Sequence, residues 1–215
     1  MKYIQIKSVR LITIVVTLIA ILAAFSTAAA NNNRVTTNEV AFQNTMRKLW
    51  EDHIIWTRLF IISAAADLPD RDLTAQRLLQ NQDDIGNAIK PFYGDAAGDQ
   101  LTELLREHIL TAVDIIDAAK ADDSADFEEA VTAWYENADE IASFLNAANP
   151  DHWPRNEMRN MMREHLDLTL EEASARLSGD FEADIAAYDK IHEQILEMAD
   201  MLSMGIIHQF PRQFR

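Results

Sequence analysis

One five-residue pattern with a histidine in its fourth position occurs three times in this chain. The three copies read Trp50-Glu51-Asp52-His53-Ile54, Leu105-Arg106-Glu107-His108-Ile109 and Met162-Arg163-Glu164-His165-Leu166. The steps between the histidines are 55 and 57 residues. Near-copies at an almost constant interval indicate a supersecondary unit that is used three times.

Apolar residues accompany each histidine at the spacing of one helix face. These residues lie seven and four positions before each histidine and one and eight positions after it. They are Met46, Leu49, Ile54 and Ile61 for His53; Leu101, Leu104, Ile109 and Ile116 for His108; and Met158, Met161, Leu166 and Ala173 for His165. Such offsets trace a single stripe along an α-helix. We therefore expect each histidine to face the core of a helical protein.

Helical patterns fill almost the whole chain from Asn38 onward, and no run alternates in the manner of a strand. The 5 Gly and 5 Pro residues cluster at a few breaks between these patterns. The breaks predict six helices, at roughly 38–66, 70–90, 96–120, 125–147, 155–177 and 180–208. The fold class is therefore all-α, and residues 38–215 are long enough to form one domain with a real core.

The repeat predicts that the six helices pair as three antiparallel hairpins, at about 38–90, 96–147 and 155–208, in one bundle. A turn follows about fourteen residues after each histidine, at Asp67, Asp122 or Gly179.

Because helical rise is constant, residues equally far from a turn meet at the same height. We expect His53 level with Asn81, His108 level with Asn137, and His165 level with Ile191 or His192. This alignment predicts a polar layer inside an apolar bundle.

Two interpretations of this layer stay open. In the first, each imidazole makes hydrogen bonds to nearby polar groups and fixes the register of the helices, because an unmet buried hydrogen bond costs about 1–3 kcal/mol.

In the second, the layer is a metal site, since helical bundles build such sites from inward side chains of facing helices. The candidate ligands are four histidines and four carboxylates: His53, His108, His165 and His192, with Asp83, Asp139, Glu193 or Glu51. This donor set suits a transition metal, namely zinc, iron or copper. The chain lacks the Glu-x-x-His and His-x-x-x-His pairs typical of bundle metal sites. A haem bound by His or Met is a further alternative.

The first thirty residues resemble an export signal. Lys2, Lys7 and Arg10 precede a nearly continuous apolar run, and Ala28-x-Ala30 offers a small-residue cleavage site. The alternative is an uncleaved transmembrane anchor at residues 11–30. A polar tether is expected at 31–37. The chain has no Cys, which excludes a disulfide framework and a lipid-modified cysteine.

The exported part is strongly acidic. Of 19 Lys+Arg and 35 Asp+Glu, three basic residues and no acidic ones lie in the first thirty positions, so the remainder carries a net charge of −19. A field of this sign repels nucleic acid and anionic membrane surfaces. Membrane contact is expected only through residues 11–30 if they stay uncleaved, and the sequence identifies no protein partner.

Two stretches resemble a known family. Leu78-Leu79-Gln80-Asn81-Gln82 with the following Asp84-Ile85-Gly86-Asn87-Ala88-Ile89-Lys90-Pro91-Phe92-Tyr93-Gly94, and Met198-Ala199-Asp200-Met201-Leu202-Ser203-x-Gly205-Ile206, are similar to a family of small exported all-helical proteins of bacteria and methanogenic archaea. The likeness runs from Leu49 to Phe214. It implies export and a helical fold, but no chemistry.

These features together predict an exported, non-enzymatic binding or structural module of the cell envelope, with a metal or small ligand at the histidine layer as its most specific form. The alternative is a metal-dependent or redox enzyme that uses the same layer. An enzyme needs a solvent path to the histidines. A partner-binding module should instead expose an apolar patch, which we expect around Phe92, Tyr93 and Trp153.

Overall fold

A computed structural model describes residues 35–215, and within this range every regular element is an α-helix. The helices are α2 (Thr37–Ala65), α3 (Arg71–Tyr93), α4 (Asp95–Ala121), α5 (Ser124–Ala148), α6 (Arg155–Ser178) and α7 (Phe181–Gln209). The expected signal or anchor at 1–30, and the tether up to residue 34, lie outside the described residues. The prediction of an all-α chain is confirmed, and the six expected ranges differ from the observed bounds by three residues at most.

The largest difference is at the end of α3, which was expected to stop before Pro91. The helix instead continues through Pro91 to Tyr93 and ends at Gly94, whose backbone N–H donates to the Lys90 carbonyl. Gly94 has φ 86°, a value that glycine adopts readily. A proline in the last turn removes only one backbone donor, so the helix ends where the glycine permits the reversal and not at the proline.

The three turns expected after the histidines occur where the sequence places them. Asp67, Asp122 and Gly179 have φ values of 51°, 57° and 80° and follow directly or closely on α2, α4 and α6. A residue in this left-handed region is a common helix terminator. In α4 and α6 the terminating residue donates its backbone N–H to carbonyls three and four positions earlier.

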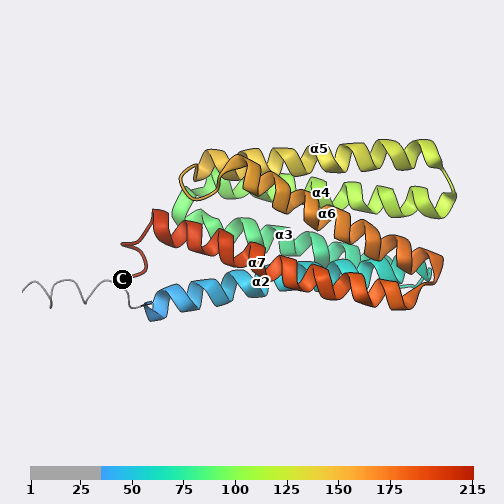
Figure 1. The fold of residues 1–215 in the computed structure, drawn as a ribbon, viewed down its shortest axis with the longest axis horizontal. Coiled ribbons are helices and arrows are strands. Elements are labelled where there is room, and N and C mark those ends of the chain that lie inside the picture. Colours follow the sequence, from blue (N-terminus) through green and yellow to red (C-terminus); the bar gives the residue numbers. More distant parts are fainter. Residues whose placement is uncertain (1–34) are drawn as a thin grey trace, which may run out of the picture. The chain divides into compact units, whose positions relative to one another are not determined.

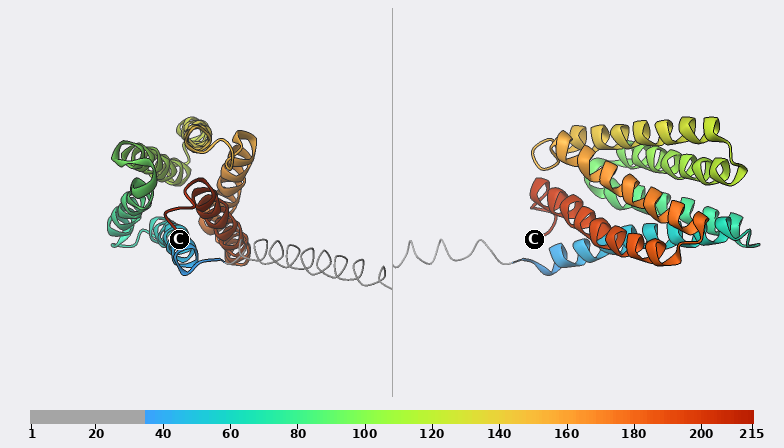
Figure 2. Two further views of the ribbon diagram at one scale, coloured as in Figure 1. Left: turned by 90° about the vertical axis from the view of Figure 1, so that its left-hand side faces the viewer. Right: turned by 45° about the vertical axis from the view of Figure 1, so that its right-hand side comes forward.

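Within residues 38–215, which form one compact unit, consecutive helices run in opposite directions (Figure 1). Each of the helices from α3 to α6 packs against the next one along the chain. The end-on view shows the helices arranged in a ring, in which α7 returns to α2 (Figure 2). Arg47 pairs with Asp200 and Glu51 lies 2.8 Å from His192 across this last junction. The helices therefore form a closed bundle.

Apolar side chains fill the inside of this bundle in two clusters. The larger cluster includes Trp50, Trp134 and Met198, and the smaller one consists of Phe60, Ile61, Ala64, Ile116 and Ala173. The polar layer lies where the two clusters approach each other. Among the described residues, no helix combines the length and the apolar character that crossing a membrane requires.

Candidate functional site

The three repeated histidines lie together inside the bundle. His53 on α2, His108 on α4 and His165 on α6 are 3%, 2% and 4% exposed. Their ring centroids are 5.7, 6.4 and 6.5 Å apart. The prediction that each histidine faces the core is confirmed, and residues more than fifty positions apart meet in one layer, which we call the histidine layer.

Each imidazole contacts a side-chain amide that lies 29 residues later in the chain. The Nδ1 atom of His108 is 3.2 Å from Asn137 Oδ1, and that of His165 is 3.3 Å from Gln194 Oε1. For His53 the contact runs from Nδ1 to Gln82 Nε2, at 3.3 Å. The expected pairing of His108 with Asn137 is confirmed. The expected partners of the other two histidines were wrong by one to three positions.

The amides are held by backbone carbonyls of the helix that carries the histidine. Asn137 Nδ2 donates to the Leu104 carbonyl at 3.1 Å, and Gln194 Nε2 donates to the Met161 carbonyl at 3.1 Å. In each case the carbonyl belongs to the residue four positions before the histidine. Asn81, and not Gln82, makes the corresponding contact in the first pair, with Nδ2 3.0 Å from the Leu49 carbonyl.

These contacts fix the tautomers of the rings. Since the amide nitrogens of Asn137 and Gln194 face carbonyls, their oxygens face the imidazoles, and His108 and His165 must donate from Nδ1. Gln82 is oriented the other way, because its Nε2 atom also donates to the Leu78 carbonyl at 2.8 Å. Its two hydrogens face three acceptors, because Asn81 Oδ1 also lies 3.3 Å away, so the contact with His53 is at most a shared hydrogen bond. Since an amide nitrogen cannot accept a hydrogen bond, the Nδ1 atom of His53 carries no proton, and its proton is on Nε2.

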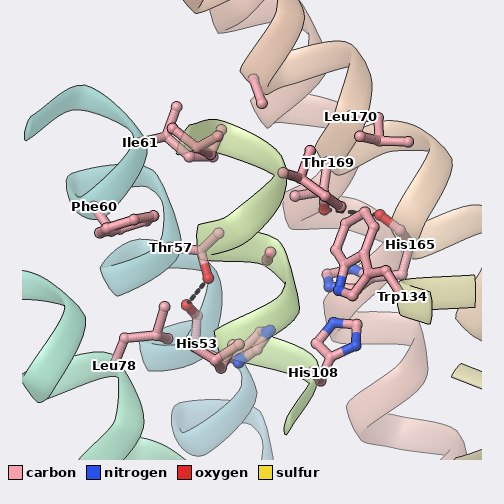
Figure 3. A pocket seen from close by; sticks show the side chains of 15 residues that line it. His53, Thr57, Phe60, Ile61, Leu78, His108, Trp134, His165, Thr169 and Leu170 are labelled. Atoms are coloured by element: carbon pink, nitrogen blue, oxygen red, sulfur yellow. Dashed lines mark hydrogen bonds between the residues drawn. The ribbon is translucent and has the colours of Figure 1, made fainter. Parts of the chain in front are cut away.

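A cavity of about 30 Å³ adjoins the histidine layer. All three imidazoles line it, together with Thr57, Thr169 and the indole of Trp134 (Figure 3). Trp134 is 2% exposed, stacks on His108 at 5.1 Å between ring centroids, and its Nε1 atom has no hydrogen-bond partner among the described residues. The rest of the lining is apolar: Phe60, Ile61, Leu78, Ile109, Ala112, Ile115, Ile116, Leu170 and Ala173.

Burial keeps the three histidines neutral. It lowers the pKa of His108 to about 3 and that of His165 to about 4, and it lowers the pKa of His53 well below its usual range. The positive charge of a neighbouring imidazole would add to the effect for His53 and His108. A charged ring would lose its hydration here without a carboxylate to compensate it.

The fourth candidate metal ligand, His192, lies outside the layer. Its Nε2 atom is 2.8 Å from Glu51 Oε1 at the junction of α2 and α7, and both side chains are about two-fifths exposed, at 41% and 42%. Ile191, the residue before it, takes the core position. Since neighbouring residues of a helix point about 100° apart, His192 is turned toward the surface.

The candidate carboxylates also lie away from the three imidazoles. Asp139 is paired with Arg159 and Arg163, Asp83 lies 3.5 Å from Arg106, and Glu193 is exposed. Within residues 35–215, no group of three or more His, Cys, Asp or Glu side chains is placed so that it could hold a metal ion. Of the expected ligands, the structure brings together His53, His108 and His165.

A second buried polar cluster was not expected from the sequence. Arg58 on α2 contacts Glu172 on α6 at 2.5 Å and Asp184 on α7 at 2.8 Å, and Arg176 contacts Asp184 at 3.1 Å. Both carboxylates are about 1% exposed. Burial raises the pKa of Glu172 to about 7, although Arg58 opposes this shift. In so acidic a chain, no spacing marks these four residues as buried.

The aromatic residues considered as a partner-binding patch are instead used within the protein. Trp153 is 2% exposed, and Tyr93 packs against both Trp153 and Phe210. Phe92 stacks on Phe214 near the end of the chain. These side chains hold the loops and the C-terminal segment against the bundle, so they offer no exposed apolar patch.

Comparison of the chain with models of protein families, with curated proteins and with solved structures finds no match in any of the three. The resemblance to small exported helical proteins stays a prediction. The function must therefore be argued from the histidine layer itself.

Proposed function

We propose that this chain is a non-enzymatic structural and binding module of the cell envelope, whose helices are locked around a closed, neutral histidine layer. The observation that carries the proposal is the burial of all three imidazoles, each with its Nδ1 atom fixed by an amide. A catalytic site needs a path for its substrate. The adjoining cavity, of about 30 Å³, has room for little more than a water molecule.

The helix pairs α2–α3, α4–α5 and α6–α7 are, in this proposal, three copies of one hairpin. The support is the separation of 29 residues between each histidine and its amide. A polar layer of this kind penalises a register shift, because any shift leaves buried donors and acceptors unpaired. It would thus select one arrangement among the many that apolar stripes alone allow.

Export is the second part of the proposal. It is supported by the composition of residues 1–30 and by the net charge of the remainder. A signal peptide cleaved before Asn31 predicts a mature protein that begins at this residue. The mass of the protein recovered from the producing cells decides between cleavage and an anchor that is retained.

A metal-dependent or redox enzyme in the same layer is the competing proposal. One observation favours it: His108 and His165 donate from Nδ1 to amide oxygens, which leaves Nε2 as the ligating atom, as in many metal sites. Zinc, iron or copper would then be bound by His53, His108 and His165, and His53 would have to give up its Nε2 proton to take part. Against it stand the lack of a nearby carboxylate and the present placement of the rings.

Elemental analysis of the purified full-length chain, prepared without a polyhistidine tag, distinguishes the histidine-layer proposal from the metal-dependent enzyme. The histidine-layer proposal predicts substoichiometric metal, no absorption from haem or iron, and a lower melting temperature for His108→Ala. His152→Ala is the matched control, because His152 is exposed, and its melting temperature should stay near that of the wild type. Stoichiometric metal that is lost in His108→Ala but kept in His152→Ala would overturn the proposal.

A further inference from the structure

We propose that the histidine layer is a binding site for one neutral molecule of the size of water, which donates two hydrogen bonds and accepts two. The donors to this molecule are His53 and Trp134, and the acceptors are His108 and His165. The inference rests on the proposed closed, neutral layer and names the ligand class that the layer would take. Water is the molecule that matches it.

The amide contacts set the direction of all three rings. Each imidazole turns its Nδ1 atom toward an amide on a neighbouring helix. The Nε2 atom lies on the other side of the ring. Figure 3 shows His53 and His108 turned toward the space between them, with Trp134 and His165 beside it. All three rings line the shared cavity, and we assign their Nε2 atoms to it.

These rings offer the cavity a defined set of hydrogen-bond donors and acceptors. Gln82 requires His53 to carry its proton on Nε2, so His53 offers a donor. Asn137 and Gln194 require the other two histidines to carry theirs on Nδ1, so each of these rings offers an Nε2 lone pair. The buried indole N–H of Trp134, which lacks a partner within residues 35–215, is the fourth group. Two donors and two acceptors match the two lone pairs and two hydrogens of water.

The orientation of Gln82 distinguishes His53 from the other two histidines. If this amide were reversed, its oxygen would face the Leu78 carbonyl at 2.8 Å and Asn81 Oδ1 at 3.3 Å. Two oxygens without a hydrogen between them repel each other. The observed orientation is therefore required, even though it leaves Gln82 Oε1 without a partner.

The size of the cavity and the polar groups of its lining exclude other ligands. A cavity of about 30 Å³ is large enough for a water molecule and far too small for an organic cofactor. A cation would meet two N–H donors and no carboxylate, and an anion would meet two lone pairs. Beyond the imidazoles and Trp134, the lining has only the hydroxyls of Thr57 and Thr169, and both already donate to backbone carbonyls of their own helices. A neutral molecule is thus the best fit.

Nuclear magnetic resonance of the ¹⁵N-labelled full-length chain in detergent micelles tests this inference with two readouts. Long-range ¹H–¹⁵N spectra report the tautomers, and we expect the Nε2–H form for His53 and the Nδ1–H form for His108 and His165. Cross-relaxation with water should give a peak at the indole proton of Trp134. Trp50 is the internal control, because its indole N–H also lacks a partner within the described range but the cavity beside it is lined by apolar side chains.

Trp134→Phe removes the indole donor and keeps an aromatic ring on His108, so the three tautomers, which the amides fix, should persist in this variant. Absence of the peak at Trp134 in the wild type, an equal peak at Trp50, or one common tautomer for all three histidines would overturn the inference. These outcomes leave the proposed function standing as long as the protein holds no metal. If this variant does not fold, the comparison of Trp134 with Trp50 in the wild type decides alone.

Discussion

Asn137 connects His108 to the backbone of the helix that carries it. Its side-chain oxygen lies 3.2 Å from His108 Nδ1, and its nitrogen donates to the Leu104 carbonyl at 3.1 Å. One residue of α5 thus satisfies a side chain and a carbonyl of α4 that are one helical turn apart. The amide can make both contacts only if α4 and α5 keep one register.

Replacement of this amide by an apolar side chain of similar size should therefore be costly. Asn137→Leu leaves the buried imidazole N–H of His108 without its partner, at about 1–3 kcal/mol, whereas the Leu104 carbonyl keeps its helical hydrogen bond and loses only the second one. We expect the free energy of unfolding in urea to fall by about 2 kcal/mol. Asn160→Leu, on the exposed side of α6, is the control and should change it by about 0.5 kcal/mol at most. Equal effects of the two changes would show that the amide contacts contribute nothing.

The neutral histidines make stability depend on acidity in a defined direction. Their pKa values are lowered in the folded state, so the unfolded state binds more protons once the pH falls below about 6.5. Stability is complete above this pH and is lost as the pH falls toward the folded values, about 3 for His108 and about 4 for His165. Three such groups should remove about 4 kcal/mol per pH unit near pH 5.

Glu172 acts in the opposite sense. Its pKa is raised to about 7 in the folded protein, so the folded state binds the extra proton between about pH 4.5 and 7, and stability rises as the pH falls. As the pH falls, the wild type should therefore lose about 2.7 kcal/mol of unfolding free energy per pH unit. Glu172→Gln should increase this loss to about 4 kcal/mol per pH unit. Urea unfolding at pH 7, 6 and 5 measures both slopes. A variant with a shallower slope than the wild type would contradict the assignment.

The buried ion cluster should stabilise the junction of α2 with α6 and α7. Arg58→Met leaves Glu172 and Asp184 buried, with Arg176 as the one remaining partner described here. Removal of one partner from a buried pair typically costs about 3–5 kcal/mol. Lys190→Met is the matched control, because its pair with Glu171 is about half exposed and should contribute less than about 1 kcal/mol. Similar losses of unfolding free energy in both variants would contradict a role for burial.

Gly86 lies at a close approach of α3 and α4. A methyl group at this position would lie 1.9 Å from Thr102 Oγ1 and 2.6 Å from the Gly98 carbonyl. In an open helix, Gly→Ala stabilises by about 0.5–1 kcal/mol, whereas overpacking typically costs about 1–3 kcal/mol. We therefore expect Gly86→Ala to lower the melting temperature.

Thr102→Ala in the same background should recover only part of that loss, because the Gly98 carbonyl is backbone and cannot rotate away. A gain in melting temperature for Gly86→Ala would mean that the two helices are not in close contact.

The sequence predicts the helices of this protein well because residues that break helices are few and lie between the apolar stripes. All six ranges follow from these stripes, from a few glycines and prolines, and from the acidic turns. Pro91 misled the prediction, since a proline in the last helical turn removes only one donor. The sequence also predicts that His53, His108 and His165 are buried, because each one lies on an apolar stripe.

The partners of the histidines are predicted less well. Constant helical rise gives the height of a residue, but its direction changes by about 100° with each position. Gln82 and Gln194 therefore replace the expected Asn81 and Ile191 or His192, although Gln194 does lie on the stripe formed by Ile191 and Met198. The buried cluster of Arg58, Glu172 and Asp184 has no comparable signal, since charged residues are frequent on every face of these helices.

We propose that the histidine layer is closed, neutral and free of metal. The most direct test is a titration of the full-length chain from pH 8 to pH 5, followed by the ring signals of His53, His108 and His165 in nuclear magnetic resonance spectra. None of the three rings should change its chemical shift over this range, and one equivalent of zinc should leave all three unchanged. A midpoint near pH 6.5 for any of these rings, or selective broadening by zinc, would contradict it.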